Sequence, residues 1–269
     1  MKILVPVDFS EISANAVRQA VALAEKSRSS LVLYHVYHRP AMPEDVLPEK
    51  SAQLLHKKQL QVQASYQQFL EAVPELASVP FTFQSELGIS TRKIPEKAAS
   101  EQADLVVMGT KGAWGFNEIW GSKTGKVSEA IECPLLIIPP KAELGNVKSI
   151  GFACDYRQEH VNEGLYHLSV FASLLGACVQ VITVVSPKEQ MQQTSPETPR
   201  KEEINGVDYS FHYVSNKDVA TGLLEYSEEQ QISIIALLRG KYSFIEKLFH
   251  ESLTQFMVEH ASKPLLVFK

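Results

Sequence analysis

Cysteine is scarce in this sequence, and its placement excludes several classes of protein. The 269 residues include three cysteines, Cys133, Cys154 and Cys178, which lie far apart along the chain. There is no close pair of the kind that binds zinc or forms a redox-active dithiol, and an odd number argues against a disulfide framework. We therefore expect three buried thiols without a chemical role.

Long apolar runs and excess positive charge are also missing. No run approaches the ~20 apolar residues of a membrane-spanning helix, and Asp8 interrupts the apolar start too early for a signal peptide. Lysine and arginine number 26 against 31 aspartates and glutamates, giving a net charge of −5. This balance opposes binding to phosphate backbones and to acidic membrane surfaces. We expect a cytoplasmic protein that binds neither nucleic acid nor membranes.

The sequence does contain an internal repeat. Three apolar segments of the first half have counterparts in the second half, and the counterparts occur in the same order. The pairs are 3–8 with 150–155, 104–108 with 233–237, and 134–138 with 264–268. Ordered matches of this kind indicate duplication of one structural unit.

The chain length also favours two domains. The boundary is predicted near the turn signals Pro139-Pro140 and Gly145-Asn146. We expect a first domain at residues 1–141 and a second domain at residues 147–269.

Each half alternates short β-branched runs with longer amphipathic stretches, a pattern typical of strands joined by crossover helices in a mostly parallel sheet. This predicts an α/β fold. Apolar stripes predict one helix through 16–24 and a long one through 54–70, and Pro95 suits the first turn of a third. The polar, proline-containing segment 186–205 predicts a mobile loop. The strands expected in the first half are 2–7, 30–36, 80–86, 104–108 and 134–138.

Glycines cluster after the fourth predicted strand, in the most informative loop of the sequence. The backbone amides of such a loop can approach an anion closely, and a helix that begins near Ser122 would add free N–H groups. The same glycines could equally form plain turns, with Ser122 as an ordinary helix cap. Side chains in this stretch that could bind phosphate are Lys111, Lys123, Lys126, Ser122 and Thr124.

Asp8 is a second candidate because it ends the first strand, where ligands of open α/β sheets bind. Its carboxylate could accept a hydrogen bond from a ligand amine or hydroxyl, or it could cap the next helix. The sequence has no Walker A loop, no G-x-G-x-x-G after the first strand, no G-x-S-x-G elbow and no H-E-x-x-H motif. His35 and His38 lie three residues apart at a strand end, so strand periodicity points them to opposite faces and no metal site is expected.

Together these motifs resemble the universal stress protein family. The resemblance rests on Val5–Ser10, His35-Val36, 107–112, Gly121-Ser122 and 133–137, whose order and spacing cover nearly all of the first half. The second half resembles a degenerate copy, so the chain is similar to a tandem bacterial member. The resemblance implies two tandem open-sheet domains of the adenine nucleotide alpha hydrolase-like type. Each would have a five-stranded parallel sheet of order 3-2-1-4-5 with helices on both faces.

The resemblance further implies a pocket for ATP with Mg²⁺ in the first domain, between strands 1 and 4. In family dimers the last strands pair, so 134–138 and 264–268 are implied to meet inside one chain as a pseudo-dimer, and a homodimer is also open. By position, the implied contacts are Pro6, Val7 and Asp8 with adenine and ribose, Val36 with the base, Met108, Gly109, Lys111 and Gly112 with the ribose and phosphate side, and Gly121, Ser122, Lys123 and Thr124 with the phosphates.

Two departures from the family pattern affect this site. The loop 113–120 has eight residues where the family has nine, and one residue supplies up to ~3.5 Å of reach. Trp114 and Trp120 in this loop could pack over the pocket. In the second half, Glu251 would repel phosphate, so we expect no ATP there. The full set of replacements is Leu238 for Gly109, Lys241 for Gly112 and Glu251 for Gly121, with only Ser252 and Thr254 kept.

The sequence therefore predicts a stress-response sensor or regulator that binds an adenine nucleotide and an unidentified protein partner. No general base stands beside a nucleophile, so at most slow ATP hydrolysis is expected. The alternative is a tandem protein that does not bind nucleotide and serves as an interaction scaffold. Adenylyl transfer is disfavoured, because the related enzymes have a Ser-Gly-Gly loop where this chain has Phe9-Ser10-Glu11.

Overall fold

The computed structural model describes residues 1–39, 48–110, 121–154, 161–187, 201–238, 257 and 262–268. The elements of the first half are β1 (Lys2–Pro6), α1 (Glu11–Ser27), β2 (Ser30–Tyr37), α2 (Pro48–Ala72), the 3₁₀ turn η1 (Pro74–Ser78), β3 (Phe81–Leu87), α3 (Ser90–Ser100), β4 (Leu105–Gly109), α4 (Gly121–Ala130) and β5 (Leu135–Ile138). Those of the second half are β6 (Ser149–Ala153), α5 (Val161–Leu175), β7 (Cys178–Val185), β8 (Lys201–Ile204), β9 (Val207–Ser215), α7 (Val219–Glu229), β10 (Ile234–Leu238) and β11 (Leu265–Phe268).

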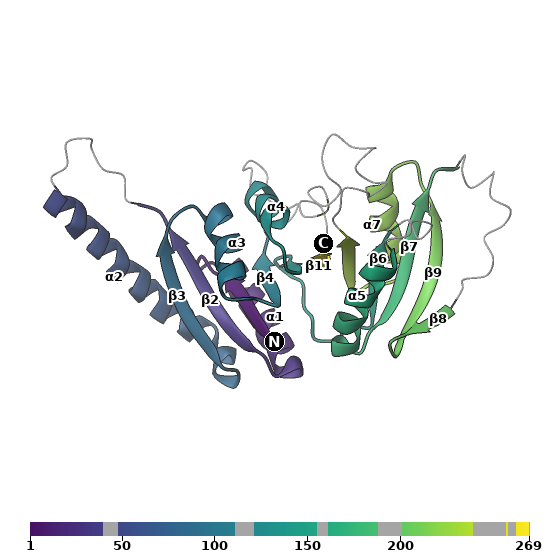
Figure 1. Cartoon of the computed structure of the whole chain (residues 1–269), viewed down its shortest axis with the longest axis horizontal. Helices are drawn as coiled ribbons and strands as arrows, with labels where there is room; N and C mark the ends of the chain where they lie inside the picture. The colour runs from purple at the N-terminus through teal and green to yellow at the C-terminus, as the bar shows by residue number, and fades with distance from the viewer. Residues whose placement is uncertain are drawn as a thin grey trace.

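The described strands form one sheet in the order β3-β2-β1-β4-β5-β11-β10-β6-β7-β9-β8, which runs through both halves of the molecule (Figure 1). The first half has the expected order 3-2-1-4-5, and the second half repeats it as β9-β7-β6-β10-β11. Neighbouring strands within these two sets pair in parallel. The α/β fold predicted from the sequence is confirmed.

The two halves meet through their last strands. β5 and β11 pair antiparallel, with Leu136 opposite Leu266 in the register. Both of these side chains are buried. The segments 134–138 and 264–268, which were expected to meet, therefore join the two sets of strands into one continuous sheet.

Helices cover both faces of the sheet. The predicted stripe of α1, from Ala16 to Ala24, is buried against one face together with parts of α2 and α5. The opposite face packs against α3, α4 and α7. Among the described residues, no helix combines the length and apolar composition that crossing a bilayer requires.

Three sequence predictions about local structure were wrong. Pro95 lies inside α3 rather than in its first turn, where its neighbours Ile94 and Ala98 are buried and hold the helix on the sheet despite the lost N–H. The predicted loop 186–205 includes a strand, β8. The three cysteines are not buried as expected: Cys178 is exposed at the start of β7, and Cys133 and Cys154 are partly exposed.

The strand β8 forms because of an Asn-Gly turn. Asn205 and Gly206 have φ angles of 53° and 76°, and the register places Ile204 opposite Val207 on either side of them. Positive φ at both central positions is the geometry that joins two antiparallel strands through a two-residue turn, and Asn-Gly is its commonest sequence. The polar composition of the segment obscured this signal.

Candidate functional site

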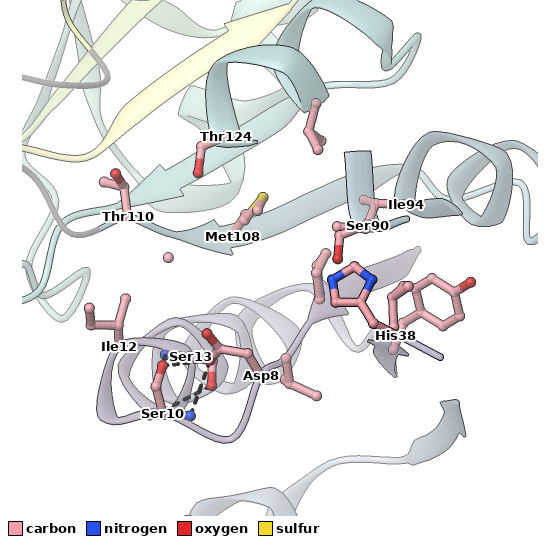
Figure 2. Close-up of a pocket in the computed structure, with 16 residues that line it drawn as sticks. Asp8, Ser10, Ile12, Ser13, His38, Ser90, Ile94, Met108, Thr110 and Thr124 are labelled. Carbon is pink, nitrogen blue, oxygen red and sulfur yellow. Dashed lines mark hydrogen bonds between the residues drawn. The ribbon is translucent and has the colours of Figure 1, made fainter. Parts of the chain in front are cut away.

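A cavity of about 280 Å³ lies at the carboxyl ends of β1 and β4, where the strand order of the first half reverses. This is the position at which open α/β sheets bind ligands. Figure 2 shows Asp8, Ser10 and Ser13, from the β1–α1 turn and the start of α1, on one side of the cavity. Met108, Thr110 and Thr124 lie across from them.

The structure brings together many of the residues singled out in the sequence. Those that line the cavity are Pro6, Val7, Asp8, Val36, Met108, Gly109 and Thr124. Lys111, Gly112, Trp114 and Trp120 lie outside the described residues. Gly121, Ser122 and Lys123 begin α4, and their side chains are not among those described.

The turn between β1 and α1 fixes the Asp8 carboxylate at the cavity. Phe9 has a φ angle of 63°, which reverses the chain, and Ser10 then caps α1 by accepting a hydrogen bond from the Ser13 N–H at 3.2 Å. The Ser10 hydroxyl and N–H donate to Asp8 Oδ1 at 2.5 and 3.1 Å. Ser10, rather than Asp8, is therefore the helix cap, and Asp8 is oriented by the cap.

These hydrogen bonds also set the charge of the carboxylate. Partial burial raises the pKa of Asp8, but hydrogen bonds from the side chains and backbone of the turn, mainly from Ser10, outweigh burial and leave the pKa below its ordinary value. Asp8 is thus an anion at neutral pH, held on the floor of the cavity.

At the end of β2, no described residue pairs with the backbone groups of Val36. The carbonyl of Tyr34 accepts from the Val7 N–H at 2.9 Å, whereas that of Tyr37 accepts from the Gly88 N–H on the other side of the strand. Successive residues of a parallel strand direct their backbone groups to alternate sides. Val36, two residues after Tyr34, therefore directs its N–H and C=O toward β1, which has already ended at Pro6.

The backbone of Val7 is already engaged within the fold. Its N–H donates to the Tyr34 carbonyl, and its own carbonyl lies 2.8 Å from His35 Nδ1. His35 also stacks on Phe9, with ring centroids 4.4 Å apart. The Val7 N–H is thus used within the fold, and His35 supports the turn.

Gly109 lies at the cavity for a packing reason. A Cβ atom at this position would lie 2.7 Å from Ile12 Cγ2 and 2.9 Å from the Ile12 carbonyl oxygen. Only glycine allows the end of β4 to approach the first turn of α1 this closely. Beyond it, the buried Thr110 and Thr124 place hydroxyl-bearing side chains on the cavity wall.

The wall of the cavity formed by β2 and α3 was only partly predicted from the sequence. Tyr34 and His38 share the face of β2 that carries Val36, so strand alternation was the signal that could have found them. Ser90 and Ile94 come from α3. The cavity residues that were not predicted as ligand contacts from the sequence are Ser10, Ile12, Ser13, Tyr34, His38, Ser90, Ile94, Thr110 and Val127.

A polar network holds the β2 side of the cavity in place. The buried Tyr34 hydroxyl donates to Glu86 Oε2 at 2.7 Å, and Lys93 Nζ binds Glu86 Oε1 at 2.7 Å. Lys97 Nζ lies 5.3 Å from the centroid of the Tyr34 ring. Burial and the nearby Glu86 carboxylate raise the pKa of Tyr34 far above its ordinary value, so its hydroxyl stays a donor.

The corresponding positions of the second half are mostly outside the described residues. Asp155, Lys241, Glu251, Ser252 and Thr254 belong to that group. Leu238, which replaces Gly109, ends β10 and packs partly buried against the core.

Comparisons with known proteins give a consistent result. The chain is similar to universal stress protein MJ0531 of Methanocaldococcus jannaschii, at 30% identity over 147 residues that cover 53% of this chain and 84% of that protein. It is 26% identical to universal stress protein Sll1388 of Synechocystis over 51% of this chain and 96% of that protein.

The fold is similar over the whole chain to a solved structure. A universal stress protein from Archaeoglobus fulgidus superposes with a TM-score of 0.72 at 17% identity, covering 100% of this chain and 98% of that one. The model of the universal stress protein family matches residues 1–139, and the chain belongs to this family.

Proposed function

We propose that the first half, residues 1–141, binds an adenine nucleotide in the cavity between β1 and β4. The observation that carries this proposal is the backbone edge of Val36. A donor and an acceptor, spaced along one strand and facing a cavity, match the donor and acceptor edge of a nucleobase. The walls around them include Ile94, Met108 and Val127, which are suited to the faces of a planar ring.

The charge of Asp8 orients the rest of the ligand. An anionic carboxylate accepts hydrogen bonds from ribose hydroxyls but repels phosphate. The phosphates would therefore extend toward Thr110, Thr124 and the start of α4. Gly121, Ser122 and Lys123 begin this helix, and Lys111 and Gly112 precede it in the chain. A helix N-terminus favours bound anions, and Mg²⁺ would accompany the phosphate chain of ATP.

The second half is proposed to have lost this function. Leu238 occupies the position at which Gly109 permits close packing in the first half, and Glu251 replaces Gly121.

We further propose that the chain is its own pseudo-dimer, which the antiparallel pairing of β5 with β11 supports. Light scattering should then give the mass of one chain, 30.0 kDa, and a mass twice as large would instead indicate a homodimer.

In this proposal the protein is a stress-response regulator in which nucleotide occupancy alters contacts with a protein partner. No residue of the cavity is assigned a catalytic role. The test is thermal unfolding of the full chain with Mg-ATP and with adenosine. A ligand at 100 times its Kd stabilises by about 2.7 kcal/mol, which corresponds to an upward shift of roughly 5–10 °C.

Two variants locate the site. Gly121→Glu copies the second half and should abolish the shift with Mg-ATP while leaving part of the shift with adenosine. Gly145→Glu adds the same charge at an exposed glycine with nothing within 4 Å of its Cβ position, and should behave as wild type. If neither ligand shifts the unfolding of the wild-type chain, nucleotide binding is wrong and the scaffold alternative is favoured.

A further inference from the structure

A second cavity, of about 580 Å³, lies on the other side of β2 from the nucleotide cavity. It separates the end of β2 from α2, the long helix at the edge of the molecule in Figure 1. The two cavities share only Val36 and His38, at the end of β2. We call the second cavity the α2 groove; its charged and aromatic lining consists of His35, Tyr37, Arg39, Lys57 and Lys58, with His38 at the rim.

Strand alternation builds the floor of the α2 groove. His35 and Tyr37 point to the face opposite Val36, and their rings lie nearly parallel with centroids 6.4 Å apart. His35 is fixed by its contacts with Val7 and Phe9. The floor is therefore aromatic and rigid.

Among the described residues, positive charge is concentrated at this groove. None of the described residues that line it is acidic. Within the described part of the chain, Arg39, Lys57 and Lys58 form no ion pair or hydrogen bond with another side chain. The sequence of α2 from Lys50 to Leu70 contains no aspartate or glutamate, although the whole protein has a net charge of −5.

His35 on the floor of the groove responds to charges on both sides of β2. Burial is the main cause that lowers its pKa; the hydrogen bond with Val7 and the charge of Asp8 raise the pKa, whereas the charges of Lys58 and His38 lower it. Like charges gathered at the groove repel one another, and a bound anion reduces this repulsion. The groove therefore favours a ligand of negative charge.

We propose that the α2 groove binds an oligophosphate group, at a site separate from the nucleotide cavity. The shape decides the class of ligand. A concave recess of this volume is in the range of small-molecule sites, whereas a bilayer surface or a nucleic acid duplex needs a broad exposed face. Arginine and lysine together can donate several charge-assisted hydrogen bonds to a chain of phosphates.

The test is calorimetric titration of the full chain with inorganic tripolyphosphate. In the double variant Lys57→Gln/Lys58→Gln the Kd should rise at least about 10-fold, since each charge-assisted hydrogen bond is worth about 1.5–3 kcal/mol. The double variant Lys26→Gln/Lys217→Gln removes the same charge from exposed positions of α1 and the β9–α7 turn, and should bind as wild type. Circular dichroism of each variant checks that the fold is retained.

Gly121→Glu separates this site from the nucleotide cavity. It should leave tripolyphosphate binding within about 2-fold of wild type, because the start of α4 is not part of the α2 groove. Displacement of tripolyphosphate by ATP in this variant would indicate that the phosphate chain of a nucleotide is also accepted, and a lack of displacement would indicate free oligophosphate. If Gly121→Glu abolishes tripolyphosphate binding and Lys57→Gln/Lys58→Gln does not, the anion binds near the glycine loop. The α2 groove proposal is then wrong while the proposed function stands.

Discussion

Replacement of Gly109 by alanine tests whether close packing of β4 against α1 shapes the nucleotide cavity. The added methyl group would lie 2.7 Å from Ile12 Cγ2 and 2.9 Å from the Ile12 carbonyl oxygen. Favourable contacts between carbon atoms need about 3.5–4.0 Å, so the neighbouring atoms must move. The Ile12 side chain can rotate, but its carbonyl belongs to the first turn of α1 and can move only with the helix.

The two opposing effects on stability can be compared. Overpacking costs about 1–3 kcal/mol, whereas removing the flexibility of glycine from the unfolded chain stabilises by about 0.4–1 kcal/mol. We expect a net loss of up to about 2.6 kcal/mol for Gly109→Ala. The measurement is urea unfolding followed by circular dichroism at neutral pH, with the free energy of unfolding extrapolated to water.

Another glycine provides a control for this experiment. A Cβ atom at Gly145 meets nothing within 4 Å. Gly145→Ala should therefore be neutral or slightly stabilising. If Gly109→Ala unfolds at the same urea concentration as Gly145→Ala, the glycine is not required by packing. Its presence would then need another reason, such as contact with a ligand.

Two further predictions concern the walls of the cavity. Tyr34→Phe removes the hydrogen bond to Glu86 from a fully buried ring and should cost about 0.5–1.5 kcal/mol in urea unfolding, whereas Tyr166→Phe, at a side chain that is 59% exposed, should change stability by less than about 0.5 kcal/mol. Equal stability of the two variants would contradict the role of the Tyr34 hydroxyl. Burial lowers the pKa of His35, so the unfolded chain takes up a proton at a pH where the folded chain does not, and stability should fall as the pH drops below about 6.5. His35→Asn should reduce this loss between pH 7.5 and 5.5 without abolishing it, because burial also lowers the pKa of His212, and the exposed His56→Asn should leave the loss unchanged. A pH dependence that is identical in all three proteins would exclude His35 as its source.

The order of the strands could be predicted from the sequence because parallel sheets leave a strong pattern. Strands buried on both faces are continuous apolar runs, and β1, β4 and β5 are of this kind. Their counterparts β6, β10 and β11 follow in the same order, so one half supports the interpretation of the other. The failures occurred where local signals competed. Polar composition hid the Asn205-Gly206 turn, and the preference of proline for the first turn of a helix led to a wrong start for α3.

Only some of the residues that line the candidate site could be predicted from the sequence, and the reason is geometrical. Residues that end β1 and β4 could be identified, because both strands stop at the point where the sheet order reverses. His38 reaches the cavity because the chain of β2 extends beyond the end of β1, and Ser90 and Ile94 reach it because α3 packs beside β2. That extension depends on how far neighbouring strands run past each other. The length of each apolar run does not determine this offset, so it was visible only in the structure.

The extension of β2 also explains why two cavities of opposite charge lie so close together. Residues on one face of the extended strand, such as Val36, line a cavity whose floor carries the Asp8 carboxylate. Residues on the other face, such as Tyr37, line the groove that carries Lys57 and Lys58. Asp8 repels phosphate from the β1 side of the first cavity, whereas the lysines of the groove attract it, so a nucleoside beside Val36 and an oligophosphate in the groove would not compete for one position. Their binding should instead be coupled through the end of β2, and adenosine bound beside Val36 should alter the affinity of the groove for tripolyphosphate by the same factor as the reverse. Equal Kd values for tripolyphosphate with and without saturating adenosine would show that the end of β2 transmits no such coupling.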